Sequence, residues 1–173
     1  MKRRTFGRLD VRTAAGIRTR GWLKAGPLVI PVALGRGGIL ANKREGDGAT
    51  PRGQYRLIRL WWRADRGARP QTLLPIRRIG RHDAWCEDPG DRRYNRPIIA
   101  AAGDRLWRDD PLYDLVIEID HNTRPRITGR GSAVFIHVAR PGLTPTAGCV
   151  ALNKNTLRRL LARLGPRTRI VIA

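Results

Sequence analysis

The residues best suited to chemistry lie between positions 132 and 152, in the sequence SAVFIHVARPGLTPTAGCVAL. This stretch places His137 and Cys149 twelve positions apart. A cysteine attacks as its thiolate, and an adjacent imidazole that accepts the thiol proton is the ordinary way to form one near neutral pH. Gly148 has no Cβ, so a substrate carbonyl can approach the N–H groups of Gly148 and Cys149, which would stabilise an oxyanion. The stretch therefore predicts a cysteine nucleophile with a histidine base.

The local pattern indicates how the two side chains meet. Residues 132–138 alternate and are rich in β-branched and aromatic side chains, which is typical of a strand that carries His137 to its end. Residues 140–146 hold two prolines and a glycine and must form a loop, after which an apolar run returns Cys149 beside His137. The alternative interpretation is that Cys149 is a small buried apolar residue and His137 a core histidine with a partner.

The motif around the cysteine favours the catalytic interpretation. Thr146, Gly148, Cys149 and Val150, preceded by a strand that ends at His137, resemble the YkuD-type catalytic domain of L,D-transpeptidases. The resemblance continues upstream and covers most of the chain, in the blocks KREGDGATPRG (43–53), DRRYN (91–95) and YDLVIEIDHN (113–122).

This resemblance implies a cysteine-dependent peptidoglycan L,D-transpeptidase. Cys149, activated by His137, would attack the third stem-peptide residue, form a thioacyl-enzyme and expel the terminal D-alanine. An amine of a neighbouring stem would then resolve the thioester as a 3→3 cross-link, and carbapenem-type β-lactams would acylate the same thiol. Thr146 would orient the loop. Many members have Arg or Asn where this chain has Ala151, so any substrate contact made there must come from elsewhere.

Two other functions remain open at this point. The first is an L,D-carboxypeptidase or other cell-wall peptide hydrolase that uses the same pair and water as the acceptor. The second is a non-enzymatic basic module that binds nucleic acid, because Lys and Arg number 35 against 14 Asp and Glu and the formal net charge is +21. No basic recognition helix or aromatic-basic repeat supports it, so stem peptides, and not nucleic acid, are the expected partners.

The rest of the sequence predicts a mainly β fold of packed mixed sheets, a YkuD-like β-sandwich, with one substantial helix after the cysteine. At 173 residues the chain suits a single catalytic domain, 1–173. The helix shows apolar residues at helical spacing and ends at Gly-Pro 165–166. About ten short strands are expected, including residues 7–13, 17–23, 28–34, 54–62, 76–79, 113–120, 132–138 and 168–173.

Several remaining residues have open or secondary roles. His121 and Asn122 follow the strand 113–120 and are accessory candidates, with a structural cap favoured over catalysis. Trp85, Tyr94 and Trp107 lie in an irregular segment and predict a satellite core in preference to a cleft wall. Cys86 follows no catalytic motif and is expected to be inert.

The sequence predicts neither a cofactor nor a metal site. The two cysteines form no Cys-x-x-Cys or paired Cys and His spacing. Residues 1–10 are charged but lack the apolar core of an export signal, and no apolar run approaches a membrane span. The resemblance implies the periplasm or cell envelope, with the export route undetermined, the cytoplasm as the alternative and a monomer as the expected state.

Overall fold

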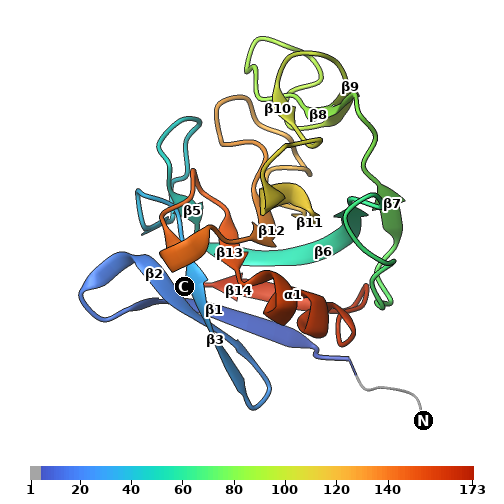
Figure 1. The fold of residues 1–173 in the computed structure, drawn as a ribbon. Coiled ribbons are helices and arrows are strands. Elements are labelled where there is room, and N and C mark those ends of the chain that lie inside the picture. The colour runs from blue at the N-terminus through green and yellow to red at the C-terminus, as the bar shows by residue number, and fades with distance from the viewer. Residues whose placement is uncertain (1–4) are drawn as a thin grey trace.

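The computed structural model describes residues 5–173 and is mainly β, which confirms the expected fold class (Figure 1). It has one α-helix, α1 (Lys154–Leu161), and two 3₁₀ turns, η1 (Pro111–Tyr113) and η2 (Pro141–Leu143). The strands are β1 (Arg8–Ala14), β2 (Ile17–Ala25), β3 (Leu28–Ala33), β4 (Ile39–Leu40), β5 (Thr50–Pro51), β6 (Gly53–Trp62), β7 (Ile76–Arg78), β8 (Asp83–Trp85), β9 (Pro97–Ile99), β10 (Asp104–Arg105), β11 (Leu115–Ile119), β12 (Phe135–Val138), β13 (Val150–Leu152) and β14 (Arg169–Ile172). The expected number of strands was too low, because strands of two or three residues are too short to show alternation.

Nine strands form one mixed sheet in the order β11-β12-β13-β3-β2-β1-β14-β6-β7. Strand β11 also pairs with β6, so the sheet closes on itself. The pairs β12–β13, β1–β14 and β6–β7 are parallel and the others antiparallel. The enclosed core is built from inward-facing residues of these strands together with the apolar side of α1.

The strands expected at residues 7–13 and 17–23 are confirmed, and together they form a hairpin. Strands β1 and β2 pair antiparallel around a turn, and β3 pairs with the other side of β2. Pro31 in β3 lies opposite Trp22 of β2, and β3 pairs with β13 only through Ala33. Pro31 therefore lies beside an open edge, where its missing N–H leaves no ladder bond unmade.

Helix α1 follows Cys149 as expected but ends before Gly-Pro 165–166. The Asn153 side chain accepts hydrogen bonds from the N–H groups of Asn155 and Thr156, as an N-cap does. The expected helical face extended to Leu164, but the α-helix stops at Leu161. Leu164 is still fully buried, because a tight turn in which its N–H donates to the Leu161 carbonyl carries it onto the core. Among the described residues, no helix has the length and apolarity needed to cross a bilayer.

The irregular segment 81–110 contains a second, three-stranded sheet, β10-β8-β9, at the top of Figure 1. Trp85 belongs to a separate apolar cluster beneath this sheet, and Trp107 packs against that cluster. Tyr94 is also buried. The predicted satellite core is therefore confirmed, and it contains Cys149.

Candidate active site

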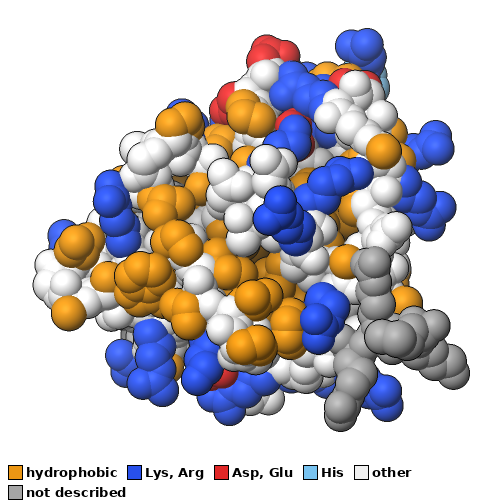
Figure 2. All heavy atoms as spheres, turned by 60° about the horizontal axis from the view of Figure 1, so that its bottom comes forward, with side chains coloured by type: hydrophobic (Ala, Val, Ile, Leu, Met, Phe, Trp, Pro, Cys, Tyr) orange, Lys and Arg blue, Asp and Glu red, His pale blue; other side chains and the backbone are white. Residues whose placement is uncertain are grey.

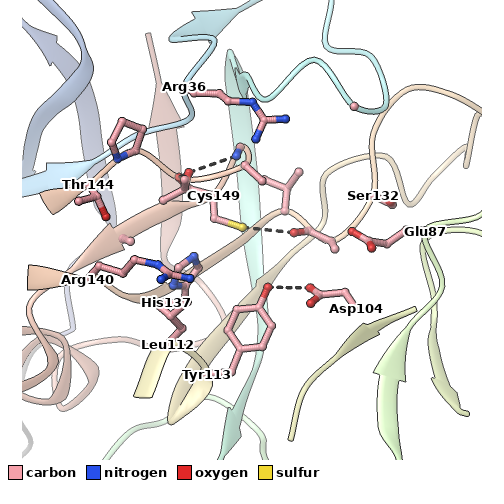
Figure 3. Close-up of a pocket in the computed structure, with 18 of the residues that line it drawn as sticks. Arg36, Glu87, Asp104, Leu112, Tyr113, Ser132, His137, Arg140, Thr144 and Cys149 are labelled. Carbon is pink, nitrogen blue, oxygen red and sulfur yellow. Dashed lines mark hydrogen bonds between the residues drawn. The ribbon is translucent and has the colours of Figure 1, made fainter. Parts of the chain in front are cut away.

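Two neighbouring parallel strands bring His137 and Cys149 together. β12 carries His137, and the register places it opposite Ala151 of β13. Cys149 immediately precedes β13, at the end of the excursion that begins after β12. Both side chains line one pocket, and the close-up shows them on the same side of it (Figure 3).

The Cys149 thiol is buried and held by backbone groups. Its side chain is 6% exposed. The Sγ–H donates to the Ala133 carbonyl at 3.3 Å, and the Phe135 N–H donates to Sγ at 3.3 Å. Burial raises the pKa of the Cys149 thiol to about 12, and the hydrogen bond from Phe135 opposes this only in part. The resting side chain is a thiol at neutral pH.

His137 is held in one tautomer by its own strand. Its Nδ1 lies 2.8 Å from the Val138 carbonyl, an oxygen that can only accept, so Nδ1 carries the proton and Nε2 has the free lone pair. The ring packs edge to face against Tyr113, with centroids 5.3 Å apart. Burial lowers the pKa of His137 to about 4. The imidazole is therefore neutral, as a general base must be.

These two pKa values correct the expectation of a thiolate that forms near neutral pH. The thiol and the imidazole are both neutral in this structure, since burial penalises the charged form of each. No hydrogen bond joins them among those of the described residues. The structure therefore contains no preformed thiolate–imidazolium pair.

Thr146 shapes the turn before Cys149. Its Oγ1 donates to the Cys149 carbonyl at 2.6 Å and accepts from the Gly148 N–H at 3.1 Å. The Gly148 N–H is therefore engaged, which departs from its expected part in an oxyanion hole. The Cys149 N–H donates no hydrogen bond among the described residues and remains the available backbone donor.

Position 148 requires a glycine because the backbone of Ala49 packs closely against it. Its φ is 138°, and an added Cβ would lie 2.8 Å from the Ala49 carbonyl oxygen. The expected reason was access for a substrate carbonyl, whereas the structure shows close packing against residue 49. The neighbouring Thr50 accepts from the buried Gly35 N–H at 2.8 Å, so the threonine of the 43–53 block fixes the floor beside the cysteine.

The pocket has a volume of about 360 Å³ and charged walls of opposite sign. In Figure 3, Arg36 lies above Cys149 and Arg140 to its left, whereas Glu87 and Asp104 lie to its right. The other charged lining residues are Lys43, Glu45 and Arg108.

The arginines differ in how far they are already paired. Arg108 makes a two-pronged ion pair with Asp110, at 2.7 and 2.8 Å. Arg140 lies 3.8 Å from the same carboxylate. The Arg36 guanidinium has no partner among the described residues, and its side chain lies flat against the backbone of Gly48, where a Cβ would come within 2.6 Å of Arg36 Cγ. Arg36 is therefore a positioned cation that is free to bind an anion.

On the acidic wall, the carboxyls are partly desolvated. Burial raises the pKa of Asp104, whose carboxylate accepts from the Tyr113 hydroxyl at 2.6 Å. The pKa of Glu87 is raised to about 7, first by desolvation and then by the nearby charges of Asp104 and Glu45. Glu87 makes no hydrogen bond or ion pair among the described residues.

A network of side chains positions the carbonyl that holds the thiol. Asn95 is 4% exposed and accepts hydrogen bonds from the Ala133 N–H and the Trp85 indole. Its amide donates to the carbonyls of His121 and Asn122. Ala133 has a φ of 52°, a strained conformation that these contacts maintain and that turns its carbonyl to Cys149. Sequence reasoning missed this network, although Asn95 lies in the block 91–95.

The accessory candidates lie outside the pocket lining. His121 Nε2 contacts the Arg130 carbonyl at 3.1 Å, and burial lowers its pKa. The Asn122 amide binds the carbonyls of Ile127 and Gly131 and accepts from the Ile127 N–H. Both side chains therefore hold the loop between β11 and β12. Within residues 5–173, no three His, Cys, Asp or Glu side chains are arranged to hold a metal ion.

The structure places a buried cysteine and a buried histidine in one pocket of a mainly β scaffold. The chain belongs to the family of L,D-transpeptidase catalytic domains, the YkuD domain, whose model matches residues 15–172. Among curated proteins, none matches the sequence. One solved structure with a similar fold is an L,D-transpeptidase from Mycobacterium tuberculosis H37Rv, with 11% identity and a TM-score of 0.43. The match covers 95% of this chain and 57% of that chain.

Proposed function

We propose that this protein is a peptidoglycan L,D-transpeptidase in which Cys149 is the nucleophile and His137 the general base. The observation that carries the proposal is the pairing of the two residues in one pocket, with His137 Nδ1 bound to the Val138 carbonyl and Nε2 left to accept a proton. Family membership supports the substrate class, since L,D-transpeptidases act on peptidoglycan stems. The active unit proposed is the whole chain, 1–173.

In the first half-reaction, Cys149 Sγ attacks the carbonyl carbon of the third stem residue while its proton passes to His137 Nε2. The carbonyl π electrons move to oxygen, and the Cys149 N–H donates to that oxyanion. The intermediate collapses with cleavage of the C–N bond. The leaving D-amino acid takes the proton from His137, and a thioester remains on Cys149.

In the second half-reaction, an amine of a neighbouring stem attacks the thioester. His137 accepts a proton from the amine and delivers it to the departing sulfur, which restores the thiol. Attack by water in place of the amine gives a carboxylic acid, the outcome of an L,D-carboxypeptidase. The same residues serve both reactions, so the acceptor alone decides which product forms.

The charged walls of the pocket orient the donor stem. Arg36 and Arg140 bind the terminal carboxylate of the leaving D-amino acid, because a guanidinium pairs well with a carboxylate. Glu87 and Asp104 contact the amino-bearing side of the substrate. This arrangement supplies from other elements the substrate contact of the Arg or Asn that many family members carry at the position of Ala151.

The test is incubation of the protein with purified tetrapeptide muropeptides, followed by mass analysis of the products. A 3→3 linked dimer with release of D-alanine supports the transpeptidase, and a tripeptide alone indicates the carboxypeptidase. Absence of both products, with no thioester adduct to a carbapenem, contradicts the proposal. We place the reaction in the cell envelope, where its substrate is found.

A further inference from the structure

All but one of the acidic residues of this chain lie in its middle segment. Residues 41–120 hold 13 of the 14 Asp and Glu, together with 16 Lys and Arg. Residues 5–40 and 121–173 also hold 16 Lys and Arg but only one acid, Asp10. These two segments supply β1, β2, β3, β14 and α1, which lie together at the bottom of Figure 1. One half of the molecule is therefore almost purely cationic.

The space-filling view shows the same separation on the surface. Figure 2 looks at the molecule with its bottom brought forward, and nearly all of the Asp and Glu visible there lie along the upper edge. Lys and Arg surround the rest of the view, and hydrophobic side chains gather over its centre and left. Such a combination of cationic and apolar side chains marks an interaction surface.

Strand register places the relevant side chains on the outer side of β1, β2 and β3. One row across these strands reads Arg12, Trp22 and Pro31, since Trp22 pairs with both of the others. In the next row Lys24 pairs with Val29 on one side and with Asp10 on the other, and the Asp10 carboxylate is ion-paired with Arg8. Arg12, Trp22, Pro31, Lys24 and Val29 are all exposed. Arg12 and Lys24 have no side-chain partner among the described residues, so their charges are available.

The apolar part of this surface is unusually open. Trp22 is 48% exposed, and Val29, opposite Lys24 near the β2–β3 turn, is 60% exposed. The other four tryptophans are less exposed, with Trp61, Trp62 and Trp85 buried. A half-exposed indole beside aliphatic side chains and basic residues suits the headgroup region of a bilayer, where Trp is favoured and Lys and Arg meet anionic headgroups.

We propose that the outer side of β1–β3 docks this protein on an anionic phospholipid surface. Trp22 and Val29 enter the headgroup region, and Arg12 and Lys24 contact lipid phosphates. The protein lies on the surface without crossing it. The inference is independent of the transpeptidase assignment, because it uses no residue of the pocket.

A lipid surface fits these observations better than nucleic acid does. Single-stranded nucleic acid is bound through several aromatic side chains that stack successive bases. Here one indole is accompanied by Val29 and Pro31 on the same side of the strands, and aliphatic side chains gain nothing from a phosphate backbone. They do gain from removal from water at a membrane interface.

The experiment measures binding to vesicles made of equal parts phosphatidylcholine and phosphatidylglycerol, with pure phosphatidylcholine vesicles as the neutral control. The full chain is expected to sediment with the anionic vesicles and not with the neutral ones, and added salt should weaken binding. The double variant Arg12→Gln with Lys24→Gln should bind about 25-fold more weakly, at about fivefold per lost charge. The matched control, Arg92→Gln with Arg105→Gln, removes two exposed charges from the acid-containing middle segment and should bind as the wild type does.

The apolar contribution has a separate readout. Trp22→Ser should weaken binding about tenfold, because part of an indole no longer leaves water. Trp22→Phe should keep most of the binding and remove the blue shift of tryptophan fluorescence that accompanies it. Equal binding to neutral vesicles, equal loss in the control pair, or binding unchanged in Trp22→Ser would overturn the proposal. Tighter binding to single-stranded RNA than to the anionic vesicles, at matched salt, would overturn it in favour of nucleic acid.

Discussion

The Val138 carbonyl accepts a hydrogen bond from Nδ1 of His137, the residue that precedes it, at 2.8 Å. The contact is local to β12, so the strand that carries the imidazole also fixes its tautomer. In many cysteine enzymes a separate side chain orients the histidine, whereas here the backbone does so. The His137 imidazole is therefore oriented without a carboxylate beside Nδ1. Its pKa is set mainly by burial.

We predict that kcat/KM for a tetrapeptide donor rises with pH through an apparent pKa of about 4 and then stays level through neutral pH. The acid limb reports protonation of His137, whose pKa burial lowers from 6.5 to about 4, and the Cys149 thiol does not ionise until about pH 12. A pH-rate profile measured with saturating acceptor checks this. An acid limb at or above 6.5 would contradict a buried neutral base.

The same shift predicts a loss of stability in acid. The folded state holds the proton on His137 less tightly than the unfolded state does. The contribution of the neutral imidazole to the free energy of unfolding is therefore complete above pH 6.5 and is lost as the pH falls from about 6.5 to about 4. The shift corresponds to about 3 kcal/mol. Denaturant unfolding of wild type and His137→Gln at several pH values should show this component in the wild type alone. If the free energy of unfolding falls equally steeply in acid for wild type and His137→Gln, the acid-dependent loss of stability does not come from His137.

For the nucleophile, we predict that Cys149→Ser and Cys149→Ala both lose turnover but differ in stability. Serine can still accept from the Phe135 N–H and donate to the Ala133 carbonyl, whereas alanine leaves that buried N–H without a partner. Alanine should therefore be about 1 to 3 kcal/mol less stable than serine. Mass analysis after carbapenem treatment should show an adduct only in the wild type and in Cys86→Ser. An adduct that depends on Cys86 would reject Cys149 as the nucleophile.

The parts of the fold and of the site that depend on local sequence patterns could be predicted, whereas those that depend on contacts between distant segments could not. Strand β12 and the return to Cys149 were predictable, because alternation and the Pro-Gly loop are local signals. The small sheet β10-β8-β9 was not, since its strands are too short for a period. Glu87 and Asp104 reach the pocket only through the packing of that sheet. The raised pKa of Cys149 was missed for a related reason: burial in the Trp85 cluster cannot be read from the motif.

Arg36 provides a test of how the donor is oriented. We predict that Arg36→Gln raises KM for a tetrapeptide with a free terminal carboxylate by about tenfold, because a charge-assisted hydrogen bond is lost. For the same donor with an amidated terminus, wild type and variant should differ little. Arg44→Gln, an exposed residue of the next loop that does not line the pocket, is the control. An equal rise in KM for both donors would mean that Arg36 stabilises the structure of the pocket and does not bind the terminal carboxylate.

Glu87 should destabilise the fold at neutral and higher pH. Its pKa is raised from 4.5 to about 7, so the folded state holds this proton more tightly than the unfolded state does. The contribution of the Glu87 carboxyl to the free energy of unfolding is most favourable below pH 4.5 and declines as the pH rises to about 7. Glu87→Gln should therefore raise the Tm relative to wild type above pH 7 and leave it nearly unchanged below pH 4.5. Removing an acid from a chain of net charge +21 also adds repulsion, so the control is Asp109→Asn, an exposed acid outside the pocket. If Glu87→Gln lowers the Tm above pH 7 as much as Asp109→Asn does, the Glu87 carboxyl is solvated in the folded protein and cannot serve as a partly neutral wall opposite Arg36.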